Sequence, residues 1–183
     1  WTAPDGTLHK AEYRYDGLSV RTESDADPGG ASPPAATTTY CYTPGGKLTS
    51  MTDAGGEGAG GSGHSRTVNY QYDATGRAFR EVQPNGQFWE WRYNKGGFVT
   101  KVLTPTGRRL EFDYNDRGRR TRRRVYDSAG ALKRSDRYGW TPQGYLRSVT
   151  KTEAGETSKV TFRRDSTGRP IWEQQDGQFV RYG

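Results

Sequence analysis

A short motif recurs along this chain of 183 residues: two aromatic residues separated by one residue, with glycine four positions after the second ring. Copies of the motif start at Tyr70, Trp91 and Phe112, 21 residues apart, and the next starts 26 residues later. A nearly fixed period of this length is typical of repeat proteins, in which each repeat is one supersecondary unit. The period therefore constrains the fold more than any single segment does.

Seven copies can be aligned along the chain. The aromatic pairs are Tyr13 and Tyr15, Tyr40 and Tyr42, Tyr70 and Tyr72, Trp91 and Tyr93, Phe112 and Tyr114, and Tyr138 and Trp140. The seventh copy keeps only Phe162, because Arg164 stands at its second ring position. The glycines that follow are Gly46, Gly76, Gly97, Gly118, Gly144 and Gly168, and the first copy has Ser19 at this position.

Each copy predicts a β-hairpin. Residues i and i+2 of a strand share a face, so both rings of a copy point the same way. The residues that follow, as in 72–77, place Asp early and Gly late, which favours a type I turn closed by a left-handed glycine. The aspartates that open turns, whose carboxylates we expect to accept backbone N–H bonds, are Asp16, Asp73, Asp127 and Asp165. A second strand and a second Gly turn complete each repeat.

The sequence therefore predicts an all-β fold, an array of antiparallel β-hairpins forming a curved or spiralling sheet, with almost no helix. We expect residues 1–183 to form one such array, interrupted by long loops at about 22–36 and 54–65, which are rich in Gly, Pro, Ser and Ala. Leu, Ile, Val and Phe together number only 23, and Tyr, Trp and Phe also number 23. Any core is thus expected to consist largely of Tyr and Trp.

The repeats resemble the tyrosine-aspartate (YD) repeats of Rhs proteins, toxin-complex proteins and teneurins. The segments that carry the resemblance are Tyr70-Gln-Tyr-Asp-Ala-Thr-Gly-Arg77, Phe112-Asp-Tyr-Asn-Asp-Arg-Gly-Arg119 and Val125-Tyr-Asp-Ser-Ala-Gly130. It extends over most of the chain and is strongest from about residue 67 onward. Two features depart from the complete family pattern: the only Asp-Pro pair, Asp27-Pro28, lies in an early loop, and the chain stops near Gly183.

The resemblance implies a function as well as a fold. Family members wind a long strip of hairpins into a hollow shell, which in bacterial members encloses a toxin domain and in teneurins serves adhesion. The chain starts without Met, so we expect a non-catalytic structural segment of such a shell, joined to the rest of a larger chain or its toxin domain. The resemblance also implies a secreted or cell-surface location, and exposed β edges predict self-association. The alternative is an adhesion module that binds carbohydrate or protein.

The chain offers little to an enzyme. His9 and His64 stand alone in turn or loop contexts, and Cys41, the single cysteine, has no nearby His to activate it. No spacing of His, Cys and carboxylates suits a metal, and the Gly-rich segment 56–61 lacks the strand and helix that nucleotide binding requires. We therefore expect no catalytic residues, no cofactor and no metal. No stretch is apolar enough for a membrane-spanning helix, and the first residues do not form a signal peptide.

The basic run from Arg117 to Arg124 is the strongest candidate for contact with an anionic partner. Residues 108–124 hold eight arginines against three acids, which is five of the chain's net charge of +7. The candidates are Arg117, Arg119, Arg120, Arg122, Arg123 and Arg124. Strand alternation predicts that Arg120, Arg122 and Arg124 share one face. Three readings are open: contacts with rings and acids of neighbouring strands, with an acidic enclosed cargo, or, as a second alternative function, with nucleic acid.

Overall fold

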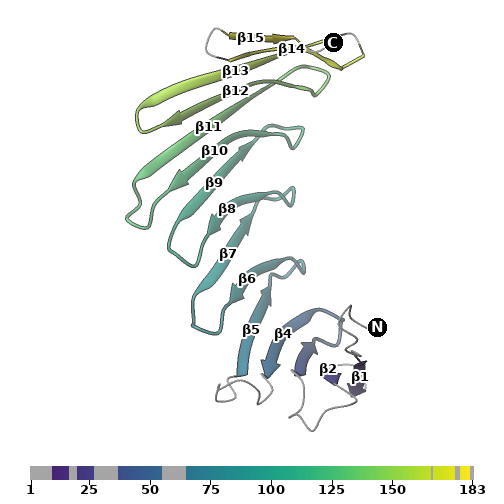
Figure 1. The fold of residues 1–183 in the computed structure, drawn as a ribbon. Coiled ribbons are helices and arrows are strands. Elements are labelled where there is room, and N and C mark those ends of the chain that lie inside the picture. Colours follow the sequence, from purple (N-terminus) through teal and green to yellow (C-terminus); the bar gives the residue numbers. More distant parts are fainter. Residues whose placement is uncertain are drawn as a thin grey trace, which may run out of the picture. The chain divides into compact units, whose positions relative to one another are not determined.

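The computed structural model describes residues 10–16, 20–26, 37–54, 65–165, 167–175 and 178–181. Contacts group the chain into two compact units, unit 1 over Trp1–Phe88 and unit 2 over Trp89–Gly183. Each unit is an antiparallel meander in which strands pair in chain order (Figure 1). The predicted all-β hairpin fold is confirmed, since the described residues hold strands and turns without a helix.

Unit 1 contains β1 (Lys10–Asp16), β2 (Val20–Ala26), β3 (Thr37–Tyr42), β4 (Leu48–Ala54), β5 (Ser65–Tyr72) and β6 (Ala78–Val82). Strand β7 (Phe88–Tyr93) begins at the boundary, and unit 2 continues with β8 (Val99–Leu103), β9 (Arg109–Tyr114), β10 (Arg120–Tyr126), β11 (Leu132–Trp140), β12 (Leu146–Glu153), β13 (Glu156–Arg164), β14 (Pro170–Gln175) and β15 (Gln178–Arg181).

One of the two predicted loops is shorter than expected. The sequence predicts a loop over 22–36, but residues 22–26 continue β2 and pair with β1 and β3. Pairing on both sides satisfies the backbone N–H and C=O groups of these residues, which outweighs their weak strand propensity. Residues 27–36, and residues 55–64 of the second loop, lie outside the described residues, as do His9 and His64.

The turn geometry follows the prediction closely. Nine turns share one pattern, in which the first residue donates its N–H to the carbonyl of the fifth and the glycine donates to the carbonyl of the first, at 2.7–3.1 Å. The glycines have φ of 73–103°. This is a type I turn followed by a left-handed glycine, and it is found at all six predicted positions from Gly46 to Gly168 and at Gly86, Gly107 and Gly130.

Alternate turns of each unit lie at opposite edges of its sheet. We call the edge with turns 43–47, 73–77, 94–98, 115–119, 141–145 and 165–169 the aromatic edge, because these turns follow the aromatic pairs. Turns 83–87, 104–108, 127–131 and 154–155 form the opposite edge. In Figure 1 the aromatic edge of unit 2 lies on the right and its opposite edge on the left.

A β-bulge accompanies the aromatic-edge turns. The register shifts at the second ring position, so that one residue of the returning strand has no direct partner. Two of these extra residues are threonines that stabilise the bulge: Thr49 Oγ1 donates to the Cys41 carbonyl at 3.1 Å and Thr100 Oγ1 to the Arg92 carbonyl at 3.2 Å. Because a bulge increases the local right-handed twist, each of these hairpins is more strongly twisted next to its aromatic-edge turn.

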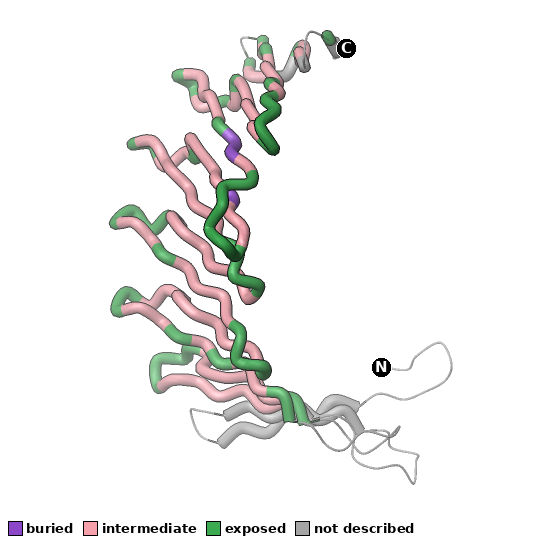
Figure 2. The backbone as a smooth tube through the Cα atoms, turned by 90° about the vertical axis from the view of Figure 1, so that its left-hand side faces the viewer, coloured by how far each residue is buried: buried purple, intermediate pink, exposed green. Residues whose placement is uncertain are grey.

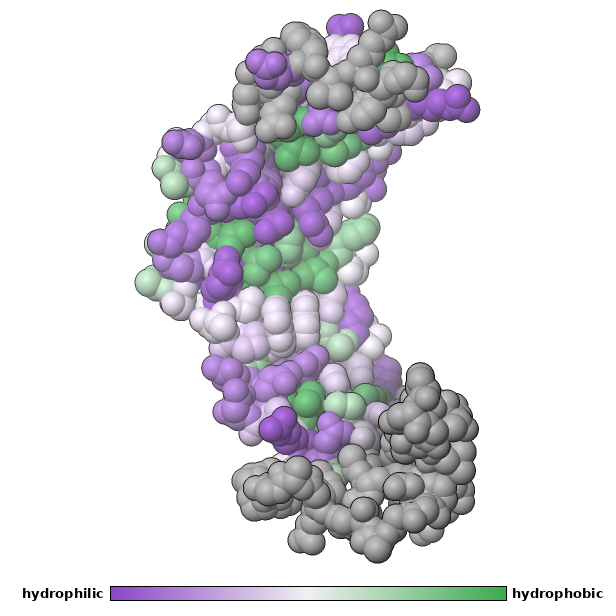
Figure 3. Space-filling view, in the orientation of Figure 1, coloured by the Kyte–Doolittle hydropathy of each residue, from purple (hydrophilic) through white to green (hydrophobic). Residues whose placement is uncertain are grey.

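The expected core of Tyr and Trp takes a different form. Each unit is a single layer, so no second sheet covers the rings, and they remain half-buried. Among the described hydrophobic residues only Val125 is fully buried, and the other buried residues are Ser135 and Asp136, on the neighbouring strand (Figure 2). Apolar side chains instead gather in a patch around β8, bordered by hydrophilic ones (Figure 3).

Register divides the side chains of unit 2 between two faces. One row of successive cross-strand partners consists of Trp91, Val102, Leu110 and Val125. These residues share one face of the sheet, which we call the ring face. Phe112, Arg123 and Asp136 form the next row of that face. The other face, which we call the charge face, carries alternate residues of the same strands, including Glu111 and Arg124. No helix in the described part of the chain is long and apolar enough to cross a membrane.

Candidate functional site

The aromatic edge holds a contact that repeats from one hairpin to the next. We call the residue directly after each aromatic-edge turn glycine the cover residue. In four copies it lies against the turn glycine of the following hairpin in the same unit. Phe98 lies against Gly118, and a Cβ built there would be closer to the Phe98 ring than real Cβ atoms come to any atom. The other described pairs are Lys47 with Gly76, Arg119 with Gly144 and Tyr145 with Gly168.

The same cover residues contact the second ring position of the following hairpin. Phe98 stacks on Tyr114 with ring centroids 5.1 Å apart. Lys47 Nζ lies 5.4 Å from the centre of the Tyr72 ring, and the Arg119 guanidinium lies 6.0 Å from that of Trp140. In the last copy, where arginine replaces the ring, Arg164 lies 5.5 Å from the Tyr145 ring. Each of these four cover residues thus joins its own turn to the second ring position of the next repeat.

A hydrogen bond completes this connection. The polar atom of the second ring donates to the carbonyl of the residue after the cover residue in the preceding hairpin. Tyr72 Oη donates to the Leu48 carbonyl at 2.8 Å, Tyr114 Oη to Val99 at 2.7 Å and Trp140 Nε1 to Arg120 at 2.8 Å. We call the cover contact and this hydrogen bond together the repeat ladder.

Sequence reasoning identified the rings and the glycines of the ladder but missed the cover residues. A signal for them exists in the sequence, because the residue after each aromatic-edge glycine has a long side chain: Lys47, Arg77, Phe98, Arg119, Tyr145 and Arg169. Interpreting that signal requires knowing that successive turns lie at the same edge. Tyr13 and Tyr15 lie in β1, where only the backbone is described.

The turns are held by their first side chain. Asp73 Oδ1 accepts N–H bonds from Thr75 at 2.9 Å and Arg77 at 3.0 Å, as predicted. Together with the Thr75 hydroxyl, these bonds hold the pKa of Asp73 well below its usual range. Asp127 and Asp165 accept turn N–H groups in the same way and also have lowered pKa values, with Lys133 the main cause at Asp127 and Thr167 at Asp165.

Two arginines of the basic run lie at the aromatic edge. Arg117 donates to the Pro142 carbonyl at 2.6 Å, in the turn of the following hairpin. Arg119 is a cover residue, and its guanidinium also donates to the Thr141 carbonyl at 3.4 Å. Both guanidinium groups therefore connect one turn to the next within the protein.

Arg120 and Arg123 lie on the ring face. The Arg120 guanidinium lies 4.4 Å from the centre of the Phe112 ring, and Phe112 is the cross-strand partner of Arg123. Alternation predicts Arg120 on the face of Arg122 and Arg124. That prediction is wrong, because the bulge at Thr121 adds a residue between Arg120 and Arg122 and shifts Arg120 to the other face.

Asp136 is the buried charge of this face, with only 1% of its surface exposed. Its Oδ1 accepts a hydrogen bond from Arg134 Nε at 2.8 Å, and Arg123 Nε lies 3.8 Å from its Oδ2. The hydrogen bond to Asp136 raises the pKa of Arg134. A carboxylate at this depth requires such partners, since an isolated buried charge is very unfavourable.

Arg122 and Arg124 lie on the charge face. Arg124 donates to Asp113 at 2.7 Å and lies 3.4 Å from Glu111, which also pairs with Arg109 at 3.1 Å. Arg122 Nε donates to Ser135 Oγ at 3.2 Å. All six arginines singled out in the sequence thus have a partner within the protein.

Arg137 is the basic residue that sequence reasoning passed over. It lies directly across from Arg122 in the β10–β11 pair and is exposed. Within the part of the chain that the structure describes, it has no ion pair or hydrogen bond from its guanidinium. Hairpin register alone would have placed it beside Arg122, had the length of the β10–β11 turn been known.

The described residues contain no group of His, Cys, Asp and Glu side chains of the kind that holds a metal in an active site. No three His, Cys, Asp or Glu side chains there are placed to hold a metal ion. Cys41 is a half-buried free thiol.

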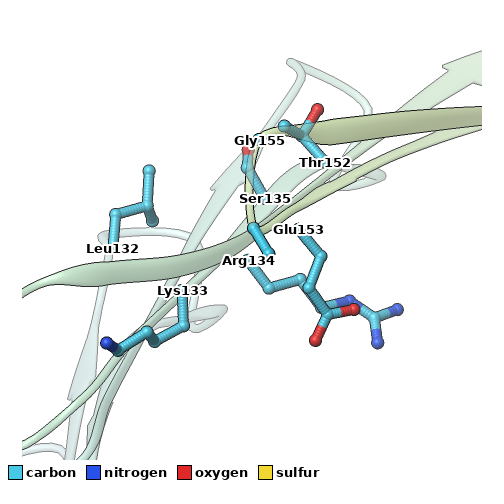
Figure 4. A pocket seen from close by; sticks show the side chains of 8 residues that line it. Leu132, Lys133, Arg134, Ser135, Thr152, Glu153 and Gly155 are labelled. Atoms are coloured by element: carbon cyan, nitrogen blue, oxygen red, sulfur yellow. The ribbon is translucent and has the colours of Figure 1, made fainter.

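A hollow of about 510 Å³ is lined by residues of β11, β12 and the 154–155 turn (Figure 4). In that view Arg134 and Glu153 lie together on one side of the strands.

The family model of the Teneurin YD-shell matches residues 35–182. The chain belongs to the YD-shell family. Two relatives from Dickeya dadantii (strain 3937) support this assignment. The "Probable deoxyribonuclease RhsB" is 32% identical over 168 residues, which is 74% of this chain and 11% of the relative. The "Probable deoxyribonuclease RhsA" is 32% identical over 158 residues, which is 70% of this chain and 10% of the relative.

Solved structures show the same fold. The crystal structure of TcdB2-TccC3-TEV matches with a TM-score of 0.65 at 14% identity, over 94% of this chain and 9% of the solved chain. The crystal structure of TcdB2-TccC3 matches with a TM-score of 0.50, also at 14% identity, over 93% and 12%. This YD-shell segment therefore spans about a tenth of its curated relatives, and the family supports a structural role for it.

Proposed function

We propose that this chain is a non-catalytic structural segment of an Rhs-like β-shell, which encloses or presents a toxin or partner domain. The repeat ladder is the observation that carries the proposal. Four cover residues, at positions 47, 98, 119 and 145, each contact the turn of the next hairpin, so the same contact can extend the array in register. Arg169 stands at the cover position of the last such turn and is exposed.

The proposal includes one continuous array over residues 1–183 and a secreted or cell-surface location. It also includes partners at both ends, namely the rest of a larger chain. In the described residues β1 and β15 each pair with one neighbouring strand, and free strand edges promote pairing with further strands. The isolated chain should therefore self-associate in size-exclusion chromatography, and added flanking repeats should suppress this.

Protease protection of an enclosed domain tests the shell. In a longer chain that contains this segment, the enclosed domain should resist protease until the array is opened. The double substitution Gly118→Ala and Gly168→Ala inserts Cβ atoms into two cover contacts and should expose the domain. The matched control, Gly130→Ala with Gly155→Ala, adds two methyl groups where no atom lies within 4 Å, and protection should be largely retained.

A domain that is digested equally fast with and without the aromatic-edge substitutions would refute the shell. The absence of catalysis is tested separately with the chain itself. Purified chain incubated with supercoiled plasmid DNA and Mg²⁺ should leave the plasmid intact. Cleavage that survives repurification would show that the segment has an activity of its own.

A further inference from the structure

We propose that the charge face of β10–β12 binds an acidic polypeptide segment at two opposed basic side chains, Arg122 and Arg137. We call these two residues the basic row. The inference rests on the proposed function, because a shell segment has a partner chain to contact on one of its faces. It names the chemistry of that partner and the residues that recognise it.

Strand register places the row. Arg122 is the cross-strand partner of Arg137, and Arg137 is the partner of Thr150. Directly opposed side chains on one face have Cβ atoms only about 4.5–5.5 Å apart, and like charges in that position destabilise a sheet. The Arg122–Arg137 pair therefore contributes nothing favourable to the fold through its charges.

The acids nearby are already engaged. Asp113, the partner of Arg122 on β9, accepts the Arg124 guanidinium at 2.7 Å. From Ser135 to Thr161 the charge face of β11–β13 carries no carboxylate, because Asp136, Glu153 and Glu156 lie in rows of the ring face. Figure 4 shows this division, with Ser135 and Thr152 on one side of the strands and Arg134 and Glu153 on the other. The positive charge of Arg137 is thus left for an external anion.

The surroundings favour carboxylates over nucleic acid. The basic row is flanked by the hydroxyls of Ser135, Thr150 and Thr152, and Arg122 already bonds Ser135. Single-stranded nucleic acid is held by rings on which its bases stack. Phe112 and Tyr138 lie on the ring face, and Tyr126, a ring of the charge face, is already in contact with the Arg109 guanidinium and bonded to Glu111. Guanidinium groups bind carboxylates with two parallel hydrogen bonds. Alternate carboxylates of an extended acidic chain are about 7 Å apart, whereas neighbouring strands lie about 4.8 Å apart. Two carboxylates can therefore reach Arg122 and Arg137 only if their long side chains spread apart, which the mutual repulsion of the guanidinium groups favours.

Binding of a fluorescein-labelled oligoglutamate to the chain, followed by fluorescence anisotropy, tests the proposal. Arg137→Ser should weaken binding about threefold and the double change Arg122→Ser with Arg137→Ser about tenfold, since partly exposed ion pairs have modest energies. The matched control is Arg108→Ser with Arg147→Ser, which removes two exposed arginines outside the row and should change affinity less than twofold. Arg137→Ser should not lower the thermal unfolding midpoint.

Equal weakening by the row variant and the control would mean that only net charge matters and would overturn the proposal. Tighter binding of a single-stranded oligonucleotide or of heparin than of oligoglutamate, lost with the same two arginines, would overturn the choice of a polypeptide partner. Either outcome leaves the protease test of the shell unaffected, so failure here is distinguishable from failure of the proposed function.

Discussion

The two edges of unit 2 use the same turn for different purposes. At both edges type I turns close on a glycine with positive φ, and at the opposite edge the two-residue turn 154–155 also ends on such a glycine. At the aromatic edge Gly118, Gly144 and Gly168 each lie under a cover residue, whereas at the opposite edge a Cβ added to Gly130 or Gly155 would have no other atom within 4 Å. Glycine is thus required twice at one edge, for conformation and for space, and once at the other.

The difference shows where neighbouring repeats are coupled. Within unit 2 backbone pairing joins each strand to the next, but the side-chain contacts that join turn to turn are concentrated at the aromatic edge. At the opposite edge Ser128 lies 3.2 Å from the Cβ position of Gly107, which is a single, looser contact. The turns of the opposite edge mainly reverse the direction of the chain. Their length varies more, since turn 154–155 has two residues and the other turns have five.

The largest difference between the two edges is expected when the loss of stability in Gly118→Ala is compared with the loss in Gly130→Ala. Alanine at positive φ costs about 1–2 kcal/mol, and overpacking against the Phe98 ring adds about 1–3 kcal/mol. We therefore expect a loss of about 3 kcal/mol for Gly118→Ala and about 1–2 kcal/mol for Gly130→Ala, measured by urea unfolding. Equal losses would mean that the cover contact has no energetic role.

A double-mutant cycle is the control for that result. Phe98→Ala removes the ring from Gly118 and Tyr114. If overpacking causes the extra loss, Gly118→Ala should be less harmful in the Phe98→Ala background. Additive losses would assign the whole effect of Gly118→Ala to its backbone conformation.

A smaller effect is expected for the ladder hydrogen bond. Tyr114→Phe removes the bond to the Val99 carbonyl and should destabilise the chain by about 1 kcal/mol. Tyr126, which precedes an opposite-edge turn, bonds Glu111 at a longer 3.2 Å. Tyr126→Phe should cost about 0.5 kcal/mol in the same unfolding experiment. A larger loss for Tyr126→Phe than for Tyr114→Phe would contradict the stronger coupling at the aromatic edge.

A gain in stability is expected at the opposite edge. Ala154 is the only described residue other than glycine with positive φ, at 51°, in the turn that joins β12 and β13. Asn-Gly is the preferred sequence for a two-residue turn of this kind. Ala154→Asn should therefore stabilise the chain by about 0.5 kcal/mol, seen as a higher thermal midpoint. A lower midpoint would show that the alanine makes a contact of its own.

The smallest effect is a dependence on pH. The lowered pKa values of Asp73, Asp127 and Asp165 mean that folding favours their charged form. Their contribution is present above the ordinary carboxyl pKa of about 3.9 and is lost as pH falls below it. Asp73→Asn with Asp165→Asn at the aromatic edge should flatten the acid limb of the stability curve more than Asp127→Asn does, since two of the three turns are changed.

Local structure was predictable from particular residues. The spacing of Tyr72 and Gly76, and of Tyr114 and Gly118, correctly predicted a strand, a turn and a positive φ. The position of Arg120 was not predictable in the same way, because strand alternation does not reveal a bulge. Nor was the strand at 22–26, where Gly and Pro just downstream made the whole segment resemble a loop.

The candidate interaction residues divide likewise. The sequence identified the run from Arg117 to Arg124, but in the structure these arginines are occupied by carbonyls, rings and carboxylates of neighbouring strands. Arg137, which has no such partner among the described residues, lies outside the run. A count of charges along the sequence does not show which charges neutralise each other between neighbouring strands of the sheet.

The sequence by itself determined the period, the hairpins, their turns and the family resemblance, because those depend on residues within about 25 positions of each other along one repeat. Only the tertiary structure decided which side chain covers which glycine, that Asp136 is buried between Arg134 and Arg123, and that Arg122 faces Arg137. The physical reason is register. A shift of one residue moves every side chain of a strand to the other face, and bulges and turn lengths set that shift only when the strands pair.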